Sequence, residues 1–340
     1  MGQGGKGREG HHRMRLRNGD SHQFLVAGLL LALAASTARA QESITFYTSL
    51  HEQNLPVILA AFEKKSGIKV NVWRAGADKV LQRTVTEAGA GRHDVDAVFV
   101  GSGELEALHR EKLLARVDSP SYRNLVAQAM PSHHEWAPAY LTVWVQEYNT
   151  NAIRKDALPK SWDELREPRW KGKLGIDGGD DDWWGKMVSV MGETKGIELF
   201  RAMVAANGVS VRKGHSLLGN LVVSGEVPFA IAMHSNLAIS AKKKGAPVDW
   251  IALDPIVARA NGIGVLASAP HPREARIFYE YLISDEGQQL LAERDYVPAS
   301  TRIASPLKKA KLHIIDPGPA LDQGEKWSKL FNETFVVRRP

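Results

Sequence analysis

The stretch ITFYTSLHEQNLPVILAAFEKKSGIKVNVW, residues 44–73, decides the fold. It begins with a short run of β-forming residues at 44–47 and ends with a second such run at 68–73. Between the two runs, Pro56 is tolerated in a first helical turn and Gly67 is a stop signal. The segment therefore predicts a strand, a helix and a second strand with short connections. The apolar face of that helix follows the spacing i, i+3, i+4, i+7, with Leu55, Ile58, Leu59 and Phe62.

The chain after residue 73 continues the same pattern. Residues 76–86 read as a second helix, ended by Gly89 and Gly91, and residues 96–100 read as a third strand. Alternation of strands and helices with short connections predicts a parallel α/β layer with right-handed crossovers. We expect the loops after the first and third strands to lead into helix N-termini. Ligands of open α/β sheets collect at such strand ends.

A second lobe is expected beyond residues 136–144, an extended stretch long enough to cross between domains. The chain is expected to cross back near 255–264, because the helix that carries Ala275 and Phe278 needs a partner sheet. Two crossings predict an α/β fold of two discontinuous lobes around a cleft. The predicted division is a signal peptide at 1–40, lobe I at 41–140 plus 256–300, and lobe II at 141–255 plus 301–340.

The formal charge of +6 would suggest a nucleic-acid or membrane-surface partner. Six of the 44 basic residues but only two of the 38 acidic residues lie within the first 40 positions. The rest of the chain is therefore close to neutral, with a charge of +2. Such a body has no bulk attraction for phosphate backbones, so nucleic acid is excluded as a partner.

The basic N-terminus is part of a predicted secretory leader. Arg13, Arg15 and Arg17 precede the apolar run 24–35, and Ala38-Arg39-Ala40 is a cleavage motif before Gln41. The apolar run is shorter than the roughly 20 residues that span a bilayer. Met14 would begin a leader of ordinary length. Because the chain has no Cys, it has neither disulfides nor a lipid anchor, and we expect a soluble protein of the periplasm.

Four ordered stretches of the mature chain carry a family resemblance. In the order of the chain they are 44–51, then 161–173, then 224–233, then 278–298. Together they resemble periplasmic solute-binding proteins of ABC importers, in the class that holds the ferric-ion, thiamine, phosphonate and polyamine binders. The resemblance implies a monomeric type II, Venus-flytrap fold with a two-strand hinge, which captures a small solute and delivers it to a permease and ATPase complex. It implies no catalysis and no cofactor.

The resemblance also implies where a ligand would bind. Ferric members use a His after the first strand, a Glu after the third strand and two adjacent Tyr in the second lobe. His51 occupies the first position, but residues 101–103 offer no carboxylate, and Glu104 lies one step beyond. The Tyr pair is replaced by Ser235 and Asn236, preceded by His234. Ferric iron prefers anionic oxygen ligands. We therefore expect a small organic anion, a phosphate ester or a phosphonate, with His51 a metal ligand only if iron is bound.

The residue types at the predicted strand ends suit an anion. Ser49, Ser102 and Gly103 would place hydroxyl and amide donors at positive helix ends, and His234, Ser235 and Asn236 would add neutral donors from the other lobe. Each of them is equally explained as a cap or a turn residue. Arg74 is a further candidate partner for a carboxylate, or else a surface residue.

The acidic and aromatic run from Asp177 to Trp184 argues against a purely anionic ligand. Asp177 and its neighbours could face an amine or a metal ion, and the alternative is a solvated helix cap. We expect Trp183 or Trp184 to form a wall of the cleft, because two adjacent Trp on a helix should not both enter one core. His133 and His134 are expected to be structural, without a third metal ligand nearby.

Two other functions stay open at this stage. A secreted hydrolase or transferase on an α/β frame is one, although the sequence has no nucleophile elbow, catalytic Cys, zinc signature or phosphate loop. A solute receptor that reports to a signalling partner is the other.

Overall fold

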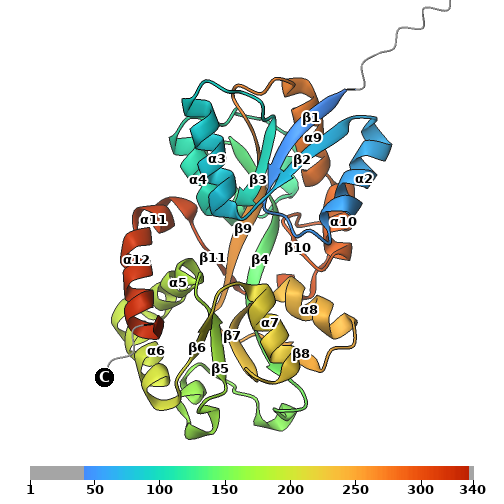
Figure 1. Cartoon of the computed structure of the whole chain (residues 1–340). Coiled ribbons are helices and arrows are strands. Elements are labelled where there is room, and N and C mark those ends of the chain that lie inside the picture. Colours follow the sequence, from blue (N-terminus) through green and yellow to red (C-terminus); the bar gives the residue numbers. More distant parts are fainter. Residues whose placement is uncertain (1–41, 337–340) are drawn as a thin grey trace, which may run out of the picture. The chain divides into compact units, whose positions relative to one another are not determined.

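The computed structural model describes residues 42–336. The predicted leader, its cleavage site before Gln41 and the alternative start at Met14 lie outside the described residues. The first lobe begins as predicted, with two helices between three strands and a third helix after them (Figure 1). These elements are β1 (Ser43–Thr48), α2 (Leu55–Ser66), β2 (Lys69–Arg74), α3 (Ala77–Gly89), β3 (Ala97–Gly101) and α4 (Ser102–Arg110).

The predicted parallel layer is confirmed, because β1 pairs in parallel with both β2 and β3. Helix α2 buries the side chains of Leu55, Ile58 and Phe62. It stops at Gly67, whose φ of 74° is a left-handed conformation that glycine adopts without strain. The amide of Gly67 donates to the carbonyl of Glu63 and closes the last turn.

Two long strands join the lobes. Strand β4 (Trp136–Asn149) and strand β9 (Ile256–Val265) are antiparallel neighbours at the centre of the sheet (Figure 1). The first part of β4 pairs with β9 and with β10 (Val297–Pro298), and its last part pairs with β7 (Phe229–His234) and β8 (Val248–Ile251). All residues of β4 are buried, as expected for a strand covered on both faces. The crossings expected near 136–144 and 255–264 are therefore present.

The second lobe is a further α/β layer with an aromatic interior. Strand β5 (Leu174–Asp177) pairs in parallel with β6 (Ser210–Arg212) and with β7. Its helices are α5 (Asp181–Met191), α6 (Glu193–Asn207), α7 (His215–Ser224) and α8 (Ser235–Lys243). Trp162, Trp170 and Phe200 are among the buried side chains of its core. In the first lobe, α9 (Pro272–Ile283) and α10 (Asp285–Glu293) complete the layer.

The last described segment contacts both lobes. After β11 (Leu312–Ile314), which pairs with β9, come α11 (Pro317–Asp322) and α12 (Gly324–Phe331). The guanidinium of Arg110 on α4 pairs with Asp322 of α11 at 2.6 Å. Trp327 of α12 packs against Gly185 of α5 so closely that a Cβ on Gly185 would lie 2.7 Å from it. The predicted assignment of 301–340 to lobe II stays a prediction, and α11 reaches across to lobe I.

Short 3-10 turns and one π turn complete the described elements. They are Pro120–Asn124, Ala127–Ala129, Lys155–Ala157, Asp163–Arg166, Pro168–Trp170, Pro306–Lys309 and, for the π turn, Asn332–Val336. Between residues 42 and 336, none of the helices has both the length and the apolar character needed to cross a membrane.

Candidate functional site

Polar side chains from both lobes meet where the strands end. In lobe I, His51 follows β1 and Ser102 follows β3. In lobe II, Asp180 follows β5, His215 follows β6 and His234 ends β7. The charge of His215 acts on His51 across the cleft and helps to lower its pKa, after burial and Arg74. The carboxyl ends of strands from both lobes therefore face one cleft, as the sequence predicts for a ligand site.

The lobe II side of the cleft is organised around His215. Its Nε2 lies 3.2 Å from Oδ2 of Asp180, and its Nδ1 lies 3.7 Å from Oδ2 of Asp177. The indole N–H of Trp144 donates to the other oxygen of Asp180 at 2.9 Å. Burial opposes a charge on His215, but Asp180 and Asp177 outweigh it and raise the pKa of the imidazole. The two buried carboxyl groups thus favour the protonated form of His215.

His234 lies against this group and stays neutral. Its ring stacks on that of His215 with 3.7 Å between centroids, and it meets the ring of Trp144 nearly edge-on. Burial, then the charges of His215 and Arg259, hold the pKa of His234 well below its usual value. A neutral imidazole carries one N–H and one lone pair, so His234 can either donate to a solute or accept from it.

Arg259 of β9 lies between the two lobes. Its Nη1 is 2.6 Å from Oδ2 of Asp182 in the first turn of α5, and its guanidinium lies over the ring of Trp144. Glu104 in the first turn of α4 faces the same guanidinium. Burial raises the pKa of Glu104, and Arg259 opposes that shift. Arg259 is therefore the cation that acidic groups of both lobes share.

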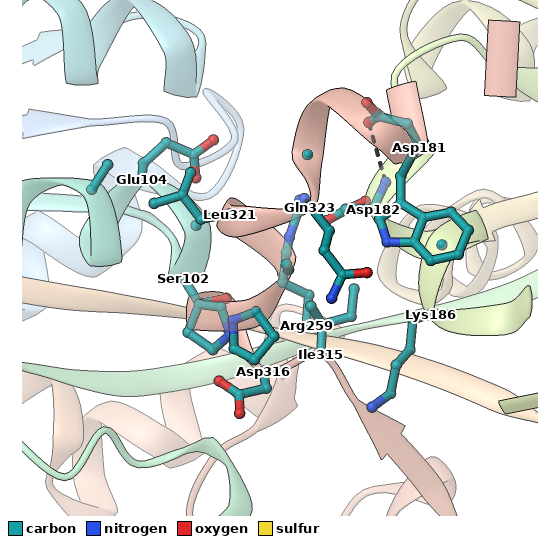
Figure 2. Close-up of a pocket in the computed structure, with 18 of the residues that line it drawn as sticks. Ser102, Glu104, Asp181, Asp182, Lys186, Arg259, Ile315, Asp316, Leu321 and Gln323 are labelled. Carbon is teal, nitrogen blue, oxygen red and sulfur yellow. Dashed lines mark hydrogen bonds and ion pairs between the residues drawn. The ribbon is translucent and has the colours of Figure 1, made fainter. Parts of the chain in front are cut away.

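A pocket of about 520 Å³ opens beside Arg259 (Figure 2). Figure 2 shows Glu104 on one side, and Asp181, Asp182 and Lys186 on the other. The segment around α11 and the start of α12 supplies a third side, which includes Leu321. The volume lies within the range typical of small-molecule sites.

Several buried polar atoms around the cleft are unsatisfied. Within residues 42–336 these include Nε of Arg259, which is a donor, and Oγ of Ser102 and Nε2 of His234, each of which can donate or accept. They also include two acceptors, Oδ2 of Asp177 and Oδ2 of Asp180, both of which face His215 without a well-aligned hydrogen bond. Leaving a buried polar group unpaired costs about 1–3 kcal/mol. A polar solute that offers both acceptors and donors would satisfy this set.

The residues predicted for lobe I are only partly where the sequence placed them. Ser102 and Gly103 do begin α4 and line the pocket. Ser49 does not precede a helix directly, because a turn separates it from α2 and the helix begins at Leu55, so the predicted helix-end donor at Ser49 is wrong. Arg74 donates from Nε to the carbonyl of Leu50 at 2.8 Å, which holds the loop that carries His51.

In lobe II, Ser235 and Asn236 begin α8 and are buried beside His234. The expectation that Trp183 or Trp184 forms a cleft wall is wrong, because both are buried in the lobe II core. Trp183 packs against Trp162, whereas Trp184 packs against Trp327 of α12. Neighbouring side chains of α5 can both be buried because the helix has core on two sides.

The Asp run is not simply a solvated cap. Asp180 is 1% exposed and Asp182 forms the ion pair with Arg259. Sequence reasoning missed His215 and Arg259. His215 follows a strand, and this position could have marked it as a candidate ligand-facing residue. Nothing in the sequence near Arg259 marks that residue.

His133 also differs from the expectation, because it does have metal-binding residues nearby. His109, His133 and Glu135 could together hold a metal ion. One ring nitrogen of each His already has a partner, since Nδ1 of His109 bonds to Glu135 at 2.7 Å and the amide of Glu135 donates to Nδ1 of His133 at 3.1 Å, whereas Nε2 of His133 is unpaired.

A fold of two α/β lobes, with a polar cleft at the strand ends and two strands joining them, defines a solute-binding protein of the two-lobe type. The chain belongs to the bacterial extracellular solute-binding proteins, whose family model matches residues 52–296. It is the periplasmic solute-binding component of an ABC transporter and not an enzyme.

The chain is similar to several iron-binding proteins. It is 28% identical to the Fe(3+)-binding periplasmic protein of Serratia marcescens over 277 residues, which cover 79% of this chain and 81% of that protein. Its fold matches iron-bound HitA of Pseudomonas aeruginosa with a TM-score of 0.72 at 21% identity, over 86% of this chain and 99% of the other.

The fold is equally similar to that of a sugar-phosphate complex. It matches AfuA of Actinobacillus pleuropneumoniae, solved with fructose-6-phosphate, with a TM-score of 0.75 at 17% identity, over 88% of this chain and all of the other.

Proposed function

We propose that the protein captures a small organic anion, with a carboxylate, phosphate ester or phosphonate group, in the periplasm and delivers it to an ABC permease. The observation that carries this proposal is the set of unpaired buried polar atoms on Ser102, His234 and Arg259, each of which can donate a hydrogen bond to an anion. They come from three elements of the two lobes. The first amides of α4 and α8 add donors at the positive ends of helix dipoles.

Tyrosinate binding of ferric iron has no support in the cleft. The β7–α8 junction carries His234, Ser235 and Asn236, which have no phenol. Two Tyr side chains of lobe I, Tyr140 and Tyr296, stack on each other with 4.2 Å between centroids. Burial raises the pKa of both phenols.

A divalent transition metal is the second candidate. Asp180, His215 and His234 offer one carboxylate and two imidazoles whose ligand atoms lie within 4.8 Å of one another. Imidazole ligands suit Zn²⁺, Ni²⁺ and Cu²⁺. Asp180 and Asp177 raise the pKa of His215, which favours a proton over a metal ion there, and we therefore place the anion first.

Native mass spectrometry of the protein purified without refolding tests the two candidates. We expect the folded protein to carry the added mass of a small organic anion. A shift equal to one metal ion would support the second candidate and overturn the first.

A titration then tests the placement of the anion. We expect His234→Gln to lower the affinity for the retained solute at least tenfold, because the glutamine amide cannot reach the same position. The matched control, His93→Gln at an exposed position of lobe I, should bind like the unaltered protein. Equal affinity of all three proteins would contradict the assignment of the cleft.

A further inference from the structure

Trp144 of β4 touches three groups of the cleft although it has almost no surface of its own there. Its side chain is 2% exposed, which leaves nearly nothing for contact with a solute. Its indole N–H donates to Oδ1 of Asp180 at 2.9 Å. Its ring meets that of His234 nearly edge-on, with 5.4 Å between centroids, and the guanidinium of Arg259 lies 5.3 Å from the ring centre. Any contribution of Trp144 to binding therefore acts through these three side chains.

The register of the sheet explains why one side chain reaches both His234 and Arg259. Trp144 lies directly opposite His234 in the antiparallel pair of β4 and β7. Thr142, two residues earlier and therefore on the same face of β4, lies opposite Arg259 in the pair of β4 and β9. Arg259 is thus a diagonal neighbour of Trp144, at a separation that aromatic and long side chains can span.

Trp144 also marks the point at which β4 passes from one lobe to the other. Val143 still pairs with Ala258 of β9, whereas Trp144 is the first residue of β4 that pairs with β7. Neighbouring strands hold the backbone on both sides of this junction. A side chain on such a backbone is a rigid support for the groups that it touches.

The hydrogen bond to Asp180 separates Trp144 from other buried tryptophans. Within residues 42–336, four of these bury an indole nitrogen that has no hydrogen-bond partner, namely Trp136, Trp162, Trp170 and Trp184. The N–H of Trp144 instead meets a carboxyl group that is itself 1% exposed and whose other oxygen lies 3.2 Å from Nε2 of His215. A hydrogen bond from a fixed donor determines where that buried carboxyl group lies.

The ring of Trp144 supports the other two groups. Nε2 of His234 and Nε of Arg259 are buried and unpaired, so both side chains have polar atoms left for a solute. The aromatic ring beside them limits the positions that the imidazole can adopt and attracts the guanidinium. A residue that hardly contacts the solute thus orients groups that do.

We infer that Trp144 is the positioning residue of the lobe II wall: its indole N–H holds Asp180, and its ring holds His234 and Arg259, in the geometry that binds the solute. This inference rests on the proposed capture of a solute between the lobes, but not on whether that solute is an anion or a metal ion. Asp180 faces His215, on which His234 is stacked, so a shift of Asp180 reaches His234 in either case.

Isothermal titration of matched variants, in protein without an affinity tag, tests the inference. The anion probes are ethyl phosphate, methylphosphonate and malonate, and the metal probe is Ni²⁺. Trp144→Phe keeps an aromatic ring and removes the indole N–H, whereas benzothienylalanine at position 144 keeps the two-ring shape and removes only the N–H. We expect each change to weaken binding of the tightest probe about tenfold or more, because Asp180 loses its fixed donor.

Trp162→Phe is the matched control, because it makes the same change at a buried tryptophan of the lobe II core whose N–H has no partner among the described residues. It should bind within about twofold of the unaltered protein. In an Asp180→Ala background, replacing Trp144 should cause no further loss, because its N–H then has no acceptor. Thermal unfolding checks that every variant is folded. If Asp180→Ala does not fold, the benzothienylalanine protein and Trp162→Phe decide the test between them.

The outcomes separate this inference from the proposed function. Equal losses in Trp144→Phe and Trp162→Phe would overturn the inference, because the effect would then be one of packing. A full loss on replacing Trp144 in the Asp180→Ala protein would also overturn it. Anion binding that is unchanged in the Trp144 variants would leave the anion standing and the positioning role refuted. If Ni²⁺ alone binds and the Trp144 variants weaken it, the anion fails and the positioning role stands. Binding of neither kind of probe to the unaltered protein would overturn both.

Discussion

The two walls of the cleft are built from different chemistry. The lobe I wall consists of a loop with His51 and the first turn of α4, where Ser102 and backbone amides face the cleft. The lobe II wall consists of buried ionisable groups, with His215 between Asp177 and Asp180 and with His234 stacked on it. An aromatic core lies directly behind the lobe II wall, and Trp144 of that core donates to Asp180.

This difference indicates which wall is preorganised. The groups of lobe II hold one another in place by ion pairs and stacking, so their ordering is complete before a solute arrives. A preorganised wall loses less conformational entropy on binding. In lobe I, by contrast, Oγ of Ser102 has no partner among the described residues. We therefore expect lobe II to determine the solute and lobe I to close over it.

The largest expected effect is that of Trp184→Ala. Because Trp184 is fully buried against Trp327 and Phe335, its removal should lower the free energy of unfolding by about 3–5 kcal/mol. Urea denaturation measures this change, with Trp73→Ala on the partly buried β2 strand as the milder control. A large loss of solute affinity at unchanged stability would instead show that Trp184 forms part of the cleft wall. It would contradict the contrast drawn between the two walls.

His215→Ala should have the next largest effect. Removing the imidazole leaves two buried carboxyl groups without their partner, which should cost about 3 kcal/mol of unfolding free energy. Asp180→Asn in the same background should restore part of it, because one uncompensated charge is then gone. His51→Ala in lobe I should cost less than about 1 kcal/mol. Equal losses at His215 and His51 in denaturation would contradict a preorganised lobe II wall.

The pH dependence gives the smallest effect and sharpens the comparison within lobe II. The folded-state pKa of His234 lies well below the usual 6.5, so below pH 6.5 the unfolded chain takes up a proton that the folded chain does not. Its contribution should thus lower stability by about 1.4 kcal/mol for each pH unit below 6.5, until the folded-state pKa is reached. His234→Gln should remove that slope.

The contribution of His215 to stability depends on pH in the opposite direction. Its folded-state pKa is raised, so its stabilising contribution is complete below pH 6.5 and is lost as the pH rises through the folded-state value. Urea denaturation of the protein and of His234→Gln between pH 5 and 7 separates the two groups. Parallel stability curves for the two proteins would show that His234 is not held neutral.

The local sequence pattern was sufficient to predict the helices and strands of the fold. The apolar spacing of Leu55, Ile58 and Phe62 predicted α2, and Gly67 predicted its end, because both depend on residues within one or two turns. The long extended run at β4 likewise indicated a crossing between lobes. The end of the third strand then located Ser102, whereas the family resemblance located His234.

Local pattern failed where a distant element determines the environment. Trp183 and Trp184 entered one core because α12, more than 130 residues later in the sequence, covers the second side of α5. Asp180 looked like a helix cap, and it is buried because Trp144 of β4 and His215 of α7 lie against it. Arg259 follows an ordinary apolar strand pattern and gains its role from Asp182 on another element.

The sequence by itself determined a two-lobe α/β protein with ligand-facing strand ends, because periodicity and strand order depend on neighbouring residues. Only the tertiary structure decided which charges meet in the cleft. The pKa of His215 and the unpaired donors of Ser102, His234 and Arg259 arise from groups far apart in the chain that become close when water is excluded. Burial and charge proximity are properties of the packed lobes, and no single segment carries them.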